Sequence, residues 1–324
     1  MGAPPTVAVR LRPYRGRVDH PAMVEVNNAA RAAAGIVERA TVESLDVDYA
    51  NLTNCDLERD IRIAELDGRT VGFGRLWWAD RNSGERSIET ICRVMPDARR
   101  RGVGSALLAF QLARVDELVA TMRTDVGDRP IIAVAYVLGR DEGALRLLDR
   151  HGFTLARRHA ELVRADLADI PDHPLPAGFE IRPIEPADRT MIRRVFDVDA
   201  EVFRDHWGDV DASDEAWRRF VASPETQPEL WQVAFDRGTG EIAGQILNFV
   251  AEGLDGRPVG WTESIAVRRP YRRRGLARAL LAASLRRVRE AGAACAALGV
   301  DTGNENRALD LYESLGFRIV AEFL

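Results

Sequence analysis

The chain has 324 residues, more than a single hydrophobic core usually serves, so we expect two domains of roughly 150 residues each. Its 46% hydrophobic and 29% charged residues are typical of globular proteins and argue against disorder. The net charge of −5 gives no bulk attraction to nucleic acid or to an anionic membrane, so we expect neither as a partner.

Missing residue types and segments exclude further classes. The sequence contains no lysine, which excludes a lysine Schiff base and a Walker-type phosphate loop. It has no apolar run of about 18 residues and no apolar N-terminal segment, so we expect a cytoplasmic protein without signal peptide or membrane span. The cysteines at 55, 92 and 295 form no CxxC pair, so we expect no disulfide framework and no metal site.

Four landmarks recur in the same order along the chain and indicate an internal repeat. In chain order they are an opening strand with Arg-Pro (12–13 and 182–183), a hairpin with two glycines (68, 72 and 240, 244), an arginine-glycine loop (99–104 and 272–277) and a Gly-Phe pair (152–153 and 316–317). The offsets are 170, 172, 173 and 164 residues. We therefore predict two similar domains, residues 1–172 and 173–324, joined by the proline-rich stretch 169–178.

The two halves differ in length at two places. The drop in offset from 173 to 164 predicts extra residues in the first half, as a surface loop near residues 122–130. The first half also continues past Phe153 as an alternating strand, residues 154–167, whereas only seven residues follow Phe317. The second sheet is therefore expected to be one strand short, with its edge filled by the first half, by a partner chain or by nothing; we favour the first.

The elements of the second half show the expected fold class most clearly. Strands are predicted at residues 179–184, 231–235, 242–250, 263–267 and 296–300, the last one central, and helices at 188–203 and 276–291. Strand pairs mixed with helices in this order predict an α+β fold with mostly antiparallel sheets.

The arginine-glycine loop is the first motif that could carry chemistry. It joins a strand to a helix, and its small residues let a ligand approach the free N–H groups at the helix start. Such a loop can hold a pyrophosphate, and neighbouring arginines can add charged hydrogen bonds. A solvated basic turn would look the same, but two copies at matched positions favour phosphate binding.

The second motif runs from Asp301 to Phe317. Asn306 can cap the helix that follows it, and Gly316 ends that helix. Helical spacing places Tyr312 near the strand ends where the arginine-glycine loop lies. Its hydroxyl could be a partly solvated core group, or it could donate a proton to a leaving thiolate.

With these motifs the chain resembles the GCN5-related N-acetyltransferase (GNAT) superfamily. The hallmark Gln/Arg-x-x-Gly-x-Gly/Ala is met by both loops, and an asparagine six residues before a tyrosine is met by Asn306 and Tyr312. The resemblance implies two tandem acyl-CoA N-acyltransferase domains with acetyl-CoA as co-substrate. It says almost nothing about the acceptor, for which a small-molecule amine is our hypothesis. It implies cofactor contacts from Ile265, Ala266, Val267, Arg272, Arg273, Arg274, Gly275, Leu276, Ala277, Asn304 and Asn306.

The resemblance also implies which residues act on the reacting atoms. Tyr312 would protonate the departing thiolate, and Glu263 lies where many members place the carboxylate that deprotonates the amine. In the first half the offset of 164 aligns Tyr312 with Leu148 and Asn306 with Glu142, so the first half is expected to be non-catalytic. It could bind a similar ligand through Val94, Arg99, Arg100, Arg101, Gly102, Val103 and Gly104, or only close the acceptor pocket.

The leading hypothesis is an N-acetyltransferase that acts on a primary amine by direct attack, as a monomer or homodimer. Acidic residues at 201, 205, 209 and 211 would suit an amine acceptor. The layout is also similar to that of mycothiol synthases, which implies acetylation of an amino-thiol sugar as an alternative. A non-catalytic acyl-CoA sensor would have no need of Tyr312, and neither loop is the GxGxxG of a dinucleotide-binding oxidoreductase.

Overall fold

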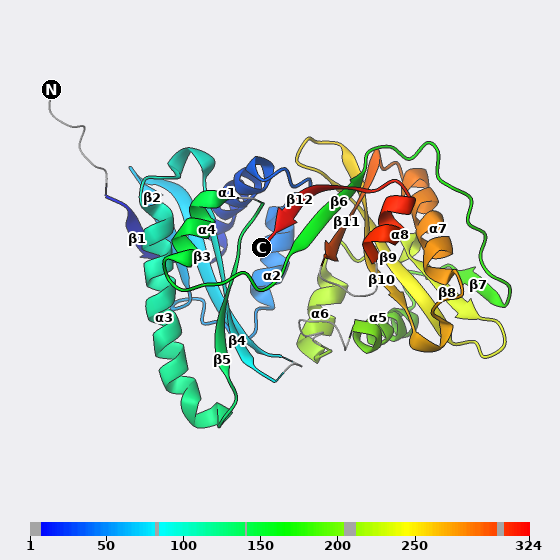
Figure 1. Cartoon of the computed structure of the whole chain (residues 1–324), viewed down its shortest axis with the longest axis horizontal. Helices are drawn as coiled ribbons and strands as arrows, with labels where there is room; N and C mark the ends of the chain where they lie inside the picture. The colour runs from blue at the N-terminus through cyan, green and yellow to red at the C-terminus, as the bar shows by residue number, and fades with distance from the viewer. Residues whose placement is uncertain (1–7, 82–83, 140, 204–211, 303–307) are drawn as a thin grey trace.

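Two β-sheets, each flanked by helices, lie next to one another (Figure 1). The structure is a computed structural model that describes residues 8–81, 84–139, 141–203, 212–302 and 308–324. All strand pairs are antiparallel except β4 with β5 and β10 with β11. The predicted α+β class with mostly antiparallel sheets is therefore confirmed.

The first sheet has the strand order β1-β2-β3-β4-β5. Its elements are β1 (Arg10–Pro13), β2 (Ile61–Leu66), β3 (Arg69–Asp80), β4 (Arg86–Val94) and β5 (Ile131–Tyr136), with α1 (His20–Ala33), α2 (Val42–Ala50), α3 (Val103–Val126) and α4 (Glu142–Asp149). Figure 1 shows α3 and α4 on the outer face, whereas α1 and α2 lie on the face towards the second sheet.

The second sheet has the order β12-β6-β11-β10-β9-β8-β7. Its strands are β6 (His159–Arg164), β7 (Phe179–Arg182), β8 (Gln232–Asp236), β9 (Ile242–Glu252), β10 (Pro258–Val267), β11 (Cys295–Asp301) and β12 (Arg318–Phe323). Its helices are α5 (Arg189–Phe203), α6 (Asp214–Ala222), α7 (Leu276–Glu290) and α8 (Ala308–Ser314). Alternation along β8 places Ala234 in the core under α7 and Val233 in the core under α5, so these helices cover opposite faces.

Strand β6 precedes the linker, yet it lies inside the second sheet, between β11 and β12. Leu162, which is fully buried, pairs with Leu298 on one side and with Ile319 on the other. The expectation that the first half supplies the missing strand is confirmed, although the strand is interior rather than at the edge and spans only residues 159–164. A cut at residue 172 therefore does not separate the two sheets.

The predicted surface loop near residues 122–130 is wrong. Helix α3 has 24 residues and α7 has 15, so the nine extra residues of the first half lengthen the helix. Leu118 and Met122 explain the extension, because helical spacing places both against Leu76 and Ile88 of the first sheet.

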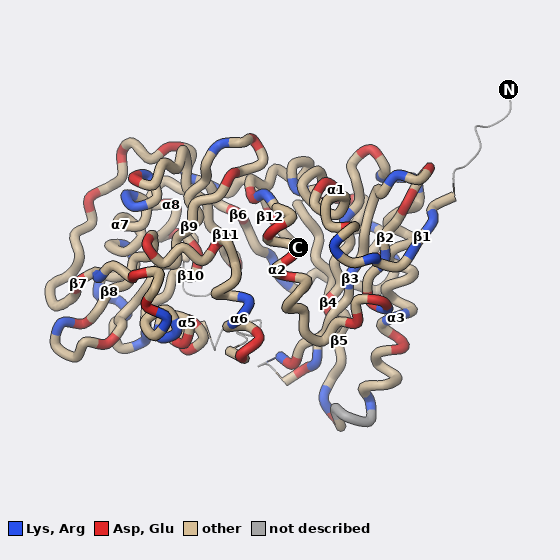
Figure 2. Tube along the Cα trace, turned by 180° about the vertical axis from the view of Figure 1, so that it is seen from behind, with Lys and Arg blue, Asp and Glu red and all other residues tan. Residues whose placement is uncertain are grey.

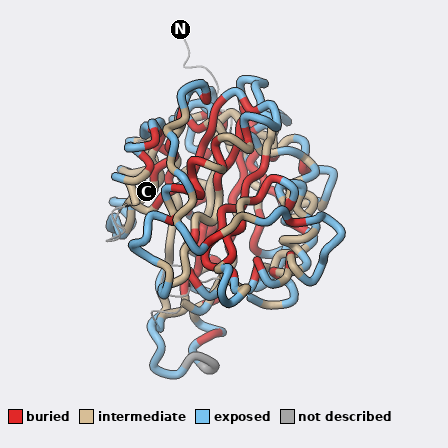
Figure 3. The backbone as a smooth tube through the Cα atoms, turned by 90° about the vertical axis from the view of Figure 1, so that its right-hand side faces the viewer, coloured by how far each residue is buried: buried red, intermediate tan, exposed pale blue. Residues whose placement is uncertain are grey.

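The halves are joined at two further places. The loop after α1 docks on β6, where the Val37 N–H donates to a Glu161 side-chain oxygen at 2.7 Å. The end of β12 reaches the first half, where Val137 and Leu324 exchange backbone hydrogen bonds of 2.8 and 3.0 Å. Buried residues follow the strands through the interior (Figure 3). Among the described helices, none has the length and apolarity needed to cross a membrane.

Candidate active site

Strand β10 is interrupted where the cofactor was expected to bind. Its register against β9 shifts between Glu263 and Ala266, and Ser264 there has φ 48°, so the strand carries a bulge. Its pairing with β11 is restricted to Val259–Trp261. The backbone of Ile265, Ala266 and Val267 therefore has no strand partner on that side, which leaves its groups available to an extended ligand.

The loop after β10 has the geometry predicted for a phosphate cradle. Arg273 and Gly275 adopt left-handed φ values of 59° and 82°, and α7 begins at Leu276 with its free N–H groups at the loop. The Arg272 Nε–H donates to the Val267 carbonyl at 2.9 Å, and the Arg274 guanidinium stacks 4.5 Å above the Phe179 ring. The protein thus holds these two side chains, and the helix N–H groups and the exposed Arg273 are further donors at the loop.

Tyr312 lies in α8, where it is 7% exposed and packs edge-on against Phe317. Burial, followed by the charge of Glu263, raises the pKa of Tyr312 to about 12. The hydroxyl therefore keeps its proton at neutral pH and can donate it. Asn304 and Asn306 lie outside the described residues.

Glu263 is half-buried on β10, directly before the bulge. Burial, and after it the charges of neighbouring carboxylates with Glu38 foremost, raise the pKa of Glu263 to about 7. A carboxyl group with this pKa can accept a proton near neutral pH and release it afterwards. Glu263 and Tyr312 thus have pKa values suited to accepting and donating a proton, and they lie within electrostatic range of each other.

The neighbours of Glu263 come from four other segments and form what we call the carboxylate cluster: Glu38, Glu161, Asp199, Glu225 and Glu263. Glu161 on β6 is 2% exposed, and burial raises its pKa to about 7. Burial also raises the pKa of Asp199 on α5 to about 6, although the hydrogen bonds that it accepts from Ser264 and Gln245 lower this pKa. Sequence reasoning missed this cluster, because no local pattern links its members.

The acidic residues at 201, 205, 209 and 211, which were predicted to attract an amine, are not the source of negative charge near Glu263 in the described part of the chain. Asp205, Asp209 and Asp211 lie outside the described residues. Glu201 accepts hydrogen bonds of 3.0 and 2.8 Å from Arg268, so its charge is balanced by that ion pair. The negative charge around Glu263 comes instead from the carboxylate cluster.

The first half repeats the loop geometry and keeps a cavity beside it. Arg100 and Gly102 have φ values of 63° and 86°, matching the second loop. A cavity of about 540 Å³ opens here, and its lining includes five of the predicted residues: Val94, Arg99, Arg100, Gly102 and Gly104. Val103 is instead buried in the core, and Arg101 is exposed.

In the first half, apolar residues stand at the positions that correspond to Glu263 and Tyr312. Strand β4 pairs with β3 without a register shift, so it has no bulge. Ile91, which lies opposite Arg75 on β3, corresponds to Glu263, which lies opposite Leu247 on β9. The Phe153 N–H bonds to the Leu148 carbonyl at 3.2 Å, as the Phe317 N–H bonds to the Tyr312 carbonyl at 3.1 Å. Ile91 and Leu148 therefore occupy the positions that correspond to Glu263 and Tyr312.

Comparisons with known proteins agree with this geometry. Models of the acetyltransferase (GNAT) family and of an acetyltransferase (GNAT) domain match residues 192–317 and 58–155. A mycothiol acetyltransferase of Nocardiopsis dassonvillei is 30% identical over 312 residues, which cover 89% of this chain and 87% of that protein.

Solved structures extend the similarity of fold to the whole chain. A GCN5-related N-acetyltransferase from Sphaerobacter thermophilus matches with a TM-score of 0.71 and 22% identity, covering 99% of this chain and 95% of that one. A tandem GNAT protein from the clavulanic acid biosynthesis pathway matches with a TM-score of 0.64 and 20% identity, covering 98% and 97%. Family models in both halves and a relative that spans nearly the whole chain place this protein in the GNAT family of acetyltransferases, whose acetyl donor is acetyl-CoA.

Proposed function

We propose that the second half moves the acetyl group of acetyl-CoA to a primary amine of a small molecule by direct attack. The observation that carries this proposal is the pairing of Glu263, with a pKa of about 7, and Tyr312, with a pKa of about 12, beside the bulge of β10. Two titratable groups whose environments separate their pKa values are typical of acid and base partners in catalysis.

Acetyl-CoA would lie along the free edge of β10. The backbone of Ile265 to Val267 would pair with its pantetheine arm, and the N–H groups from Arg273 to Ala277 would hold the pyrophosphate. Asn304 and Asn306 remain proposed cofactor contacts. This placement brings the thioester between Glu263 and Tyr312.

The reaction needs no covalent enzyme intermediate. Glu263 removes a proton from the ammonium group, and the free amine attacks the thioester carbon. Backbone N–H groups stabilise the oxyanion of the tetrahedral intermediate. When this intermediate collapses, the carbon–sulfur bond breaks and Tyr312 gives its proton to the departing coenzyme A thiolate. The attacking nitrogen loses its surplus proton, which restores the Tyr312 hydroxyl and leaves the neutral amide.

The carboxylate cluster supports an amine as the acceptor, since a protonated amine is attracted to a site with several carboxylates. The finer alternative is the acetylation of an amino-thiol sugar, and the names of the curated relatives support it. No described residue singles out such a sugar.

For the first half we propose binding without turnover. Its cavity and loop match the proposed cofactor site of the second half, whereas Ile91 and Leu148 can neither accept nor donate a proton. The same surface would also close one side of the acceptor site.

A panel of amines, the mycothiol precursor among them, incubated with acetyl-CoA tests the proposal through the release of free thiol. We expect turnover that falls about 10²- to 10⁴-fold in Tyr312→Phe and in Glu263→Gln. Undiminished turnover in both variants would contradict the assignment. Binding of acetyl-CoA without turnover on any amine would favour a sensor.

A further inference from the structure

Two arginines lie on the face of the first sheet that looks towards the second half. Arg75 on β3 opposes Ile91, and Arg93 is the next residue of β4 on the same face, so the two side chains are diagonal neighbours. In the second half, Leu247 on β9 corresponds to Arg75, and Ala266 on β10 corresponds to Arg93. The first half thus has an apolar residue, Ile91, where the second half has a carboxylate, and it has two arginines where the second half has apolar residues.

Neither arginine has a carboxylate partner within the described ranges. Arg93 donates only to the Asn27 side chain at 3.3 Å and to the Cys92 carbonyl at 3.1 Å. Burial and the nearby charges of Arg31 and Arg75 lower its pKa to about 10. Asp48 is within electrostatic range of Arg75 without an ion pair to it.

The surroundings of Arg75 contain unused hydrogen-bonding groups. Its guanidinium lies 4.8 Å from the ring centroid of Trp77 and 5.1 Å from that of Tyr49, and its buried Nε has no partner. The Tyr49 hydroxyl lies near the Arg75 guanidinium, which counteracts part of the rise that burial causes in the pKa of Tyr49. It makes no hydrogen bond of normal geometry, although Tyr49 is only 6% exposed. Buried donors and half-buried cations without acceptors are unfavourable, so these groups point to a ligand that supplies oxygen atoms.

This basic pair lies near the proposed transfer site. Glu38 changes the pKa of Arg93 and is also the foremost charged neighbour of Glu263. Glu38 is held at 2.8 Å by Arg31, next to the loop that docks on β6. Both views place α2, which carries Tyr49, beside α6 between the two sheets (Figure 1 and Figure 2).

We infer that Arg75, Arg93 and the Tyr49 hydroxyl bind an oxyanion, a carboxylate or a phosphate, carried by the amine acceptor. This inference rests on the proposed function. The acceptor is then an amine with an acidic group at its far end: its amine meets the carboxylate cluster and its oxyanion meets the arginines. The planar guanidinium forks give the oxyanion bidentate, charged hydrogen bonds.

The arrangement also explains how the site would select its acceptor. An amine without an acidic group leaves the two guanidiniums and the Tyr49 hydroxyl unpaired, and a site built for hydrogen bonds discriminates strongly against a ligand that lacks them. The opposite charges at the two ends direct the amine, rather than the acidic end, towards Glu263.

The test compares amines that differ only in the acidic group, such as β-alanine with its amide and phosphoethanolamine with ethanolamine. We expect the wild type to favour the acidic amines. Arg75→Gln and Arg93→Gln should each raise KM for the acidic amines about tenfold or more and leave KM for their neutral counterparts unchanged. Arg123→Gln, an exposed residue of α3, is the matched control and should change neither.

Thermal melting with inorganic phosphate or acetate gives a readout that does not depend on turnover. We expect either anion to stabilise the wild type and the Arg123→Gln control more than an Arg75→Gln, Arg93→Gln double variant, which keeps the helix N–H groups of the two arginine-glycine loops as anion sites. Stabilisation by free anions together with equal KM for acidic and neutral amines would overturn the link to the acceptor. If neither anion stabilises the wild type, the oxyanion site itself is refuted. If no amine is acetylated, the proposed function fails, and the melting experiment still tests the oxyanion site.

Discussion

Glu263 combines a position that the sequence predicts with an environment that it does not. The resemblance to the GNAT superfamily places a carboxylate at this strand position. The other members of the carboxylate cluster come from two loops, a strand and a helix, and only the folded chain brings them together. A local pattern predicts the residue, whereas its pKa depends on contacts that are distant in sequence.

The pH dependence of turnover follows from this environment. Glu263 must be ionised to accept a proton, so kcat/KM should rise with pH up to about 7 and then level off. In Glu263→Gln the rising limb should disappear together with most of the activity. The exposed Glu241→Gln serves as the control; a rising limb that persists in Glu263→Gln would show that another group is the base.

The same residue should also influence stability. Folding raises the pKa of Glu263 from 4.5 to about 7, so the ionised carboxylate destabilises the folded state, and this penalty grows as the pH rises from about 4.5 through 7. Glu263→Gln should therefore unfold at higher urea concentration than the wild type at pH 8, with the difference vanishing below pH 4.5. Urea titrations at both pH values check this, and equal midpoints at pH 8 would contradict it.

Among the secondary-structure elements, those with clear spacing agree well with prediction. The helix expected at 188–203 is α5 at Arg189–Phe203, and the strand expected at 296–300 is β11 at Cys295–Asp301. The extension of α3 was missed because the polar stretch obscured Leu118 and Met122, which pack on the sheet. The bulge of β10 was also not predicted, because it is defined by pairing with β9 rather than by composition.

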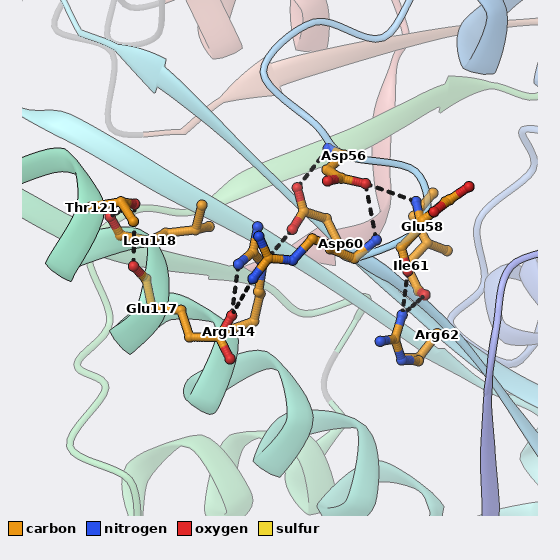
Figure 4. A network of polar contacts seen from close by, with 10 residues as sticks. Asp56, Glu58, Asp60, Ile61, Arg62, Arg114, Glu117, Leu118 and Thr121 are labelled. Carbon is orange, nitrogen blue, oxygen red and sulfur yellow. Dashed lines mark hydrogen bonds and ion pairs between the residues drawn. The ribbon is translucent and has the colours of Figure 1, made fainter.

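A buried polar network fixes α3 to the first sheet (Figure 4). Arg114 on α3 donates to Asp60 at 2.6 Å, and Asp60 also accepts from the Asp56 N–H at 2.6 Å. Asp60→Ala removes the buried partner of Arg114 and leaves only the exposed Glu117 to balance its charge, which should lower the free energy of unfolding by about 3 kcal/mol.

Chemical denaturation of Asp60→Ala beside Glu117→Ala measures this effect. Glu117 also bonds to Arg114, but it is exposed, so its removal should lower the free energy of unfolding by less than about 1 kcal/mol. Equal losses in the two variants would contradict a buried role for Asp60.

For the whole molecule, the placement of β6 is the feature that links the halves. The repeat in the sequence correctly indicates two related units, and the strand predicted after Phe153 is the one that joins the second sheet. Where that strand inserts could not be derived, because pairing across the linker leaves no local signature. The insertion between β11 and β12 makes the second sheet dependent on residues before residue 172.

Two fragments test this dependence. Residues 153–324 retain β6, whereas residues 173–324 lose it and leave β11 and β12 without a shared partner. We expect the longer fragment to unfold cooperatively in urea and the shorter one to show no cooperative transition, as measured by circular dichroism. Equally cooperative unfolding of both fragments would contradict the structural role of β6.

The division of labour between the halves is the central claim, and one matched pair of variants tests it most directly. Gly275 and Gly102 hold the same left-handed conformation, so replacement by glutamate strains both loops equally and places a negative charge at each proposed phosphate site. We predict that Gly275→Glu lowers kcat/KM for acetyl-CoA at least about a hundredfold, while Gly102→Glu retains most of it. A large loss in Gly102→Glu with activity preserved in Gly275→Glu would contradict catalysis in the second half.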